Sequence, residues 1–197
     1  VELLIPFFLA FEGRRPQARE LVVLAVMCAL AVAGRVAIPI PSFKAIFGII
    51  MIAGIAFGPE SGFLVGAISA LASNFFYSQG PYTPWQMMAY GAGGMLAGFV
   101  FAEGRLPRKP VVMGIFGFLA VAFFVGPLLD TCSVFLVMSR ITLKGAMAFY
   151  ISGFPVNLRQ AVATAIVLLV LGKPLLEKLD RIKTKYGILD DEGRKEA

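Results

Sequence analysis

The sequence predicts an all-α integral membrane protein, a six-transmembrane-helix bundle with structured outer loops. The chain of 197 residues is 58% hydrophobic and only 15% charged, whereas soluble domains carry about a quarter charged residues. Its apolar residues fall into stretches of roughly 13 to 20, the length expected of membrane-spanning helices. We therefore expect one membrane domain over residues 19–176, after an N-terminal segment, 1–18, and before a basic tail, 177–197.

Six apolar stretches define the expected helices. They are residues 21–36, 45–57, 62–77, 84–102, 111–129 and 157–176. Between the last two, cations interrupt residues 130–155, and we expect an outer cap or a re-entrant segment there. A seventh span is the alternative, and it would place the two chain ends on opposite sides. Residues 1–11 are too short to span, so we expect the tail of a truncated helix or an interfacial segment.

The distribution of lysine and arginine favours six crossings. With six, thirteen of the eighteen cations lie on one side, near the N-terminus, in the loop 105–109 and in the tail. Such a bias marks the cytoplasm, so we expect a multi-pass protein of the plasma membrane with both termini cytoplasmic. A seventh span would move either the loop or the tail outward. The same distribution favours the lipid bilayer over nucleic acid as the partner of a chain with net charge +6.

The second apolar stretch is too short to cross a bilayer alone. Its 13 residues cover about 20 Å against about 30 Å of hydrocarbon. The preceding Pro39 and Pro41 resist helix, so we expect a structured loop that dips toward the membrane. Irregular backbone at that depth is tolerated against protein or a wet cavity, which predicts a cavity open to the outer face.

Five cations but a single acid, Asp130, belong to the outer half of the chain. Arg35 and Arg159 lie within or at the ends of apolar helices, where ionisable groups are costly and usually face a cavity. We expect a pocket for a ligand with a carboxylate, a phosphate or many acceptors, with Asp130 pairing one cation. The alternatives are snorkelling to lipid headgroups and a structural pair between Asp130 and Arg159. Further candidates at the mouth are Phe43, Lys44 and Asn157.

Residues 74–90, NFFYSQGPYTPWQMMAY, concentrate aromatic rings, amides and prolines between two expected helices. The rings would stack on a flat ligand and the amides would hydrogen-bond it. An aromatic belt at the outer interface is the alternative. The candidates are the rings of Tyr82, Trp85 and Tyr90 and the amides of Asn74, Gln79 and Gln86.

Small residues at helical spacing predict close helix contacts. Ala25, Ala29 and Ala33 recur every four residues and form a stripe along which another helix can approach. The glycine pairs favour packing inside the bundle, and they are Gly62 with Gly66 and Gly94 with Gly98.

Motifs for catalysis are absent from the sequence. It has no GxxxxGK[ST] phosphate loop, no HExxH, no GxSxG, no carboxylate pair in its apolar part and no histidine, so we expect no enzyme, metal site or cofactor. Cys28 and Cys132 lack metal spacing and are expected to pack as inert thiols. The leading hypothesis is a small-molecule binding and translocation subunit that takes its energy from partner proteins. The alternatives are a self-sufficient secondary transporter or channel, and a membrane enzyme centred on Arg35, Asp130 and Arg159.

The chain resembles the substrate-specific (S) component of an energy-coupling factor (ECF) vitamin transporter, especially its cobalamin-type branch. The resemblance covers about residues 14–189 and is carried by RRPQARELVVLAVMCALAVAGR before PSFKA, by SNFF with QGPYTPWQM, and by FPVNLRQAVAT. It implies a six-helix subunit that captures a vitamin from outside under two closing loops, between helices one and two and between helices three and four.

The resemblance also implies partners. It implies docking through Ala25, Ala29 and Ala33 on a transmembrane coupling (T) subunit that two cytoplasmic ATPases drive. Two departures leave the vitamin open, because Tyr82 stands where the branch has Trp and PIPSFK replaces LPQFKP. Cobalamin is therefore one candidate for the vitamin, and the sequence does not identify which vitamin is bound.

Overall fold

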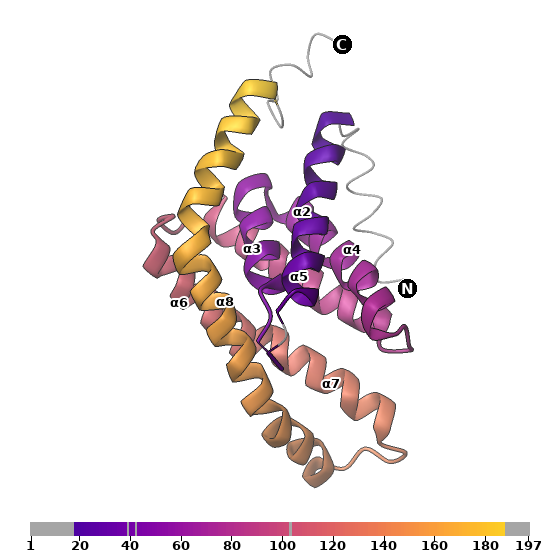
Figure 1. Ribbon diagram of the computed structural model, residues 1–197. Coiled ribbons are helices and arrows are strands. Elements are labelled where there is room, and N and C mark those ends of the chain that lie inside the picture. The colour runs from indigo at the N-terminus through magenta and orange to yellow at the C-terminus, as the bar shows by residue number, and fades with distance from the viewer. Residues whose placement is uncertain (1–17, 39, 42, 103, 188–197) are drawn as a thin grey trace.

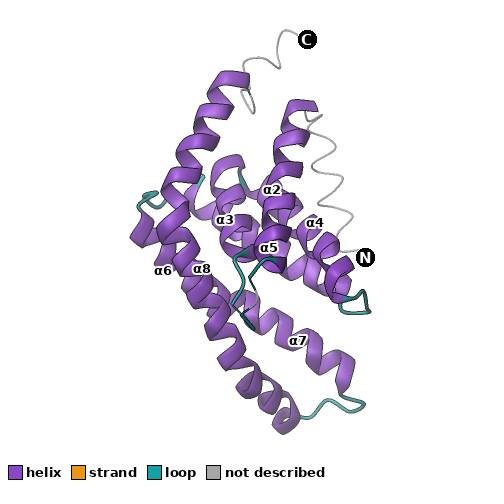
Figure 2. Ribbon diagram, in the orientation of Figure 1, coloured by secondary structure: helices purple, strands orange, loops and turns teal. Residues whose placement is uncertain are grey.

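The computed structural model describes residues 18–38, 40–41, 43–102 and 104–187, and these form a helical bundle without a strand (Figures 1 and 2). Since α6, η2 and α7 run on as one helix, the described residues form six helices. The expectations for residues 1–17 and 188–197, and for Pro39, lie outside the described residues. The elements are α2 (Ala18–Val36), α3 (Ile46–Phe57), α4 (Pro59–Tyr77), α5 (Thr83–Phe101), α6 (Pro110–Ala120), the π-helix η2 (Val121–Val125), α7 (Gly126–Val137) and α8 (Leu143–Tyr186).

The helices alternate in direction between two ends of the bundle (Figure 1). At one, called the terminal end, the first turns of α2 and the last turns of α8 line one groove, through Val23 and Ile182. Arg108, just before α6, forms a 3.6 Å ion pair with Asp180 of α8 at this end. The opposite end, called the loop end, holds the α2–α3 and α4–α5 loops. The first described helix therefore starts, and the last described helix ends, at the same end of the bundle.

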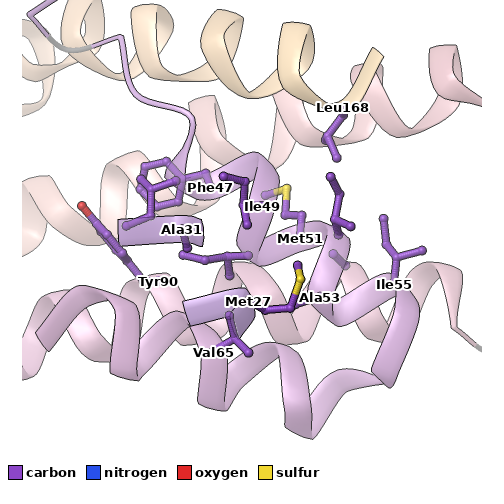
Figure 3. Close-up of a cluster of buried hydrophobic side chains, with 14 of the residues drawn as sticks. Met27, Ala31, Phe47, Ile49, Met51, Ala53, Ile55, Val65, Tyr90 and Leu168 are labelled. Atoms are coloured by element: carbon purple, nitrogen blue, oxygen red, sulfur yellow. The ribbon is translucent and has the colours of Figure 1, made fainter. Parts of the chain in front are cut away.

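Helix α3 forms the centre of the bundle. All 12 of its residues are buried, because α2, α4, α5 and α8 pack around it. Figure 3 shows its side chains, among them Phe47 and Met51, in one cluster with Met27 of α2, Val65 of α4 and Leu168 of α8. The helix is about 18 Å long, so it is shorter than a hydrocarbon core, as the sequence predicts.

Glycines bring α3, α4 and α5 into backbone contact. A Cβ at Gly62 would overlap the carbonyl of Gly94, and a Cβ at Gly66 would overlap the carbonyl of Tyr90. Larger residues would push these helices apart. The expected packing of the glycine pairs inside the bundle is confirmed.

Residues 130–155, where the sequence predicts an outer cap or a re-entrant segment, form a helical hairpin from the end of α7 and the start of α8. Only the turn 138–142 leaves the helical conformation between α7 and α8. Thr142 then caps α8, since its side chain accepts a hydrogen bond from the backbone N–H of Gly145. The polar residues of this region therefore mark a short turn between two long helices. The fifth helix ends later, and the sixth helix begins earlier, than the apolar stretches 111–129 and 157–176 predict.

Among the described residues, two helices are long and apolar enough to cross a bilayer, by length and composition. They are the continuous helix Pro110–Val137, of 28 residues, and α8, of 44 residues. Helix α8 is about 66 Å long, so it exceeds a hydrocarbon core of about 30 Å. It continues without a break past residue 176, and its last turns carry the basic part of the expected tail to Tyr186.

Candidate functional site

Arg35 occupies the last turn of α2, and its guanidinium reaches α4 at the loop end. Its Nη1 donates to the Asn74 Oδ1 at 2.9 Å and also to the Ser73 Oγ. The same guanidinium lies over two rings, 4.9 Å from the centroid of Tyr77 and 5.6 Å from that of Tyr90. Neutral acceptors and aromatic faces therefore hold this half-buried cation.

Asn74 links three helices. Its side chain is 0% exposed, and its Nδ2 donates to the Thr83 Oγ1 at 3.2 Å and to the Gln86 Oε1 at 2.8 Å. Together with the bond from Arg35, these occupy three of the four hydrogen-bonding positions of the amide. Asn74 therefore positions α2, α4 and α5 relative to one another, and it has little capacity left for a ligand.

Side-chain hydrogen bonds fix the α4–α5 loop. The Gln79 Nε2 donates to the Leu71 carbonyl at 3.0 Å, and its Oε1 accepts from the Thr83 Oγ1 at 2.9 Å. Ser78 has φ 81° and ψ 144°, a conformation that side chains rarely adopt. Such strain persists only where the surrounding structure holds it, and it concentrates at ligand sites.

The α2–α3 loop brings a second cation to the loop end. The Lys44 Nζ donates to the Ile38 carbonyl at 2.6 Å and lies 5.8 Å from the Tyr77 ring centroid. Phe43, beside it, is half-buried. In the described part of the chain, no ion pair joins Lys44 or Arg35 to an acid. We call the set of Arg35, Lys44, Ser73, Asn74, Tyr77, Thr83, Gln86 and Tyr90 the loop-end network.

The three rings expected to stack on a flat ligand do not face one another. Trp85 donates to a backbone carbonyl of α7 and packs against an α7 ring with a centroid separation of 5.9 Å. The Tyr82 hydroxyl donates to the Ser78 carbonyl at 2.8 Å, within its own loop. Tyr90 is buried and packs edge-on against Phe47, with centroids 4.6 Å apart. Only Tyr90 belongs to the loop-end network.

Asp130 and Asn157 form a separate polar pair between α7 and α8. The Asn157 Nδ2 donates to the Asp130 Oδ2 at 2.7 Å, and a Cβ at Gly153 would overlap the Asp130 carboxylate. Arg159 is exposed and donates to the Pro155 carbonyl of its own helix at 3.2 Å. The alternative pair of Asp130 with Arg159 is not formed. Arg159 follows Asn157 by two residues of α8, a rotation of about 200° around the helix axis, so Arg159 points away from Asp130 when Asn157 points toward it.

Three members of the network escaped the sequence reasoning. Ser73, Tyr77 and Thr83 all contact residues that it had singled out. The Tyr77 hydroxyl also donates to the Arg35 carbonyl at 3.0 Å. Helical spacing could have predicted Tyr77, because it follows Asn74 by three residues and therefore lies on the same face of α4.

The alanine stripe of α2 faces away from the bundle. Ala25, Ala29 and Ala33 are exposed, and the last two line an apolar surface groove of about 490 Å³ between α2 and α4. Ala72 and Phe76 form the α4 side of this groove. The small side chains leave the backbone of α2 open to close approach by another helix.

The loop end offers hydrogen-bond donors to a ligand. Among the described residues, the Gln86 Nε2 and the Nε and Nη2 of Arg35 donate to no protein acceptor. Such donors suit carbonyl, hydroxyl or phosphate oxygens. The site therefore fits a ligand rich in acceptors.

Comparison with known proteins identifies the family. The model of the family described as "ECF-type riboflavin transporter, S component" matches residues 16–177. No curated protein and no solved structure matches the chain significantly. The match supports the resemblance to ECF S components and gives no support to the cobalamin-type branch. Members of this family are membrane subunits of vitamin transporters and not enzymes, and this chain belongs to the family of ECF-type riboflavin transporter S components.

Proposed function

We propose that this chain is the membrane-embedded S subunit that binds riboflavin, or a close flavin relative, at the loop end. The family match over residues 16–177 carries the proposal. The loop-end network supports it, because donors and aromatic faces from α2, α4 and α5 converge there. A flavin offers a flat ring and many acceptor oxygens and nitrogens, which suits such a site.

In this proposal six helices span the plasma membrane, and the terminal end faces the cytoplasm. The cations support this orientation. Arg19, Arg108 and Lys183 lie at the terminal end, close to the last turns of α8, and lysine and arginine accumulate on the cytoplasmic side. The loop end then opens outward, where a vitamin to be imported arrives.

Partners supply the energy in this proposal. The chain has no phosphate-binding loop, so a T subunit and two cytoplasmic ATPases would drive the delivery of the vitamin. The exposed stripe of Ala25, Ala29 and Ala33, with the groove beside it, would receive a helix of the T subunit. The lipid bilayer would cover the remaining apolar surface.

Titration of the purified chain in detergent tests the ligand. Riboflavin is added and its fluorescence is followed, with cobalamin titrated in parallel by calorimetry. We expect saturable binding of one riboflavin per chain and no binding of cobalamin. A chain that keeps its helical circular dichroism but binds neither riboflavin nor its close relatives would contradict the proposal.

A further inference from the structure

Two cations at the loop end share one aromatic ring. The Arg35 guanidinium lies 4.9 Å and the Lys44 ammonium 5.8 Å from the centroid of Tyr77. Since both distances run to one point, the two charges lie within about 11 Å of each other. They come from different segments, the end of α2 and the α2–α3 loop, which the fold brings together.

No acid of the described residues neutralises these two charges. Within the described residues neither cation forms an ion pair. The single acid of the outer half, Asp130, is instead bonded to Asn157. A pair of half-buried cations without a counter-charge repel each other. An anion bound between them would remove that repulsion.

The hydrogen bonds of Arg35 leave one edge of its guanidinium open. Nη1 is held by Asn74 and Ser73, whereas Nε and Nη2 donate to no described residue. This remaining pair of N–H groups forms the planar fork that matches two oxygens of a phosphate or carboxylate. Lys44 uses one of its three donors, on the Ile38 carbonyl.

We infer that Arg35 and Lys44 form an anion subsite, and that the chain favours the phosphate ester of the flavin over the uncharged vitamin. The inference rests on the proposed function, since it places the flavin in the loop-end network. A phosphate monoester carries a charge of about −1.5 to −2 at pH 7, which matches two cations. A carboxylate, with a single charge, would leave one cation unpaired.

Two ligands that differ only in the phosphate test the inference. Riboflavin and riboflavin 5′-phosphate are titrated against the purified chain at low salt, and the ratio of their dissociation constants is measured. We expect the phosphate ester to bind at least about tenfold more tightly, and the ratio to approach one at high salt because screening weakens charge pairs.

Substitutions locate the effect. Lys44→Gln keeps a polar side chain and removes one charge, so the ratio should fall by about tenfold. Lys144→Gln removes an exposed cation at the start of α8 and should leave the ratio unchanged. Because the ratio is measured on protein that binds flavin, a variant that fails to fold cannot imitate the expected result.

The possible results separate the two claims. Riboflavin binding as tight as, or tighter than, that of its phosphate ester would overturn the inference and leave the proposed function intact. An equal fall in the ratio for Lys44→Gln and Lys144→Gln would also overturn it, because the effect would then reflect net charge alone. Failure of both flavins to bind the folded chain would refute the proposed function itself.

Discussion

Replacing Asn74 with leucine tests whether the loop-end network holds three helices together. The two side chains are similar in size, so Asn74→Leu removes hydrogen bonds with little change in packing volume. The variant loses the bond accepted from Arg35 and the bonds donated to Thr83 and Gln86. Arg35 lies on α2, and Thr83 and Gln86 lie on α5. The contacts of α4 with α2 and with α5 therefore weaken together.

The expected loss in the free energy of unfolding follows from these three bonds. Neutral hydrogen bonds contribute about 1 kcal/mol each and a bond to a charged group about 2 kcal/mol, so the upper value is about 4 kcal/mol. Hydrogen bonds between helices of membrane proteins average about 0.6 kcal/mol, which gives a lower value of about 2 kcal/mol. We expect a loss between these two values.

The assay is reversible unfolding of the purified protein in detergent, followed by circular dichroism. Ser61→Ala is the matched control, because Ser61 is also fully buried in α4 and its hydroxyl has no hydrogen-bond partner among the described residues. The control should change the free energy of unfolding by less than about 0.5 kcal/mol. Equal losses for the two variants would refute the view that Asn74 joins the helices.

Three further substitutions test other parts of the structure. Ala29→Leu should preserve flavin binding and abolish co-purification with the T subunit. The control Ala148→Leu, at an exposed alanine of α8, should preserve both. Co-purification of the Ala29→Leu variant with the T subunit would show that the T subunit docks on another face. Gly153→Val should overlap the Asp130 carboxylate and lower the free energy of unfolding by about 2 kcal/mol, and an unchanged midpoint would contradict the close contact. Ser78→Gly should relieve the φ of 81° and raise the free energy of unfolding by about 1 kcal/mol, as measured by thermal unfolding; destabilisation would argue against strain there.

The apolar stretches located most helices from the sequence alone. The expected stretches 21–36 and 84–102 correspond to Ala18–Val36 and Thr83–Phe101, because a run of apolar residues is a local property of the sequence. Hydropathy does not determine where a helix ends, however. The N-cap residue Thr142 sets the start of α8, and hydropathy gives no sign of it beside Arg140 in the turn 138–142.

The site was predictable only in its composition. Asn74, Gln86 and Arg35 do converge, since buried amides and cations in apolar helices must bond one another. Trp85 and Tyr90 do not converge, because five residues of helix turn them about 140° apart. Which face of each helix turns inward depends on contacts between helices distant in sequence, and a single sequence does not reveal those rotations.

In the proposed function, this chain binds the vitamin and other subunits supply the energy for its transport. Accumulation of riboflavin inside proteoliposomes, measured with this chain alone and then with the T subunit, both ATPases and ATP, tests it most directly. We predict binding without accumulation by the chain alone, and accumulation against a gradient only with its partners and ATP. Accumulation by the chain alone would contradict the account and favour a self-sufficient transporter.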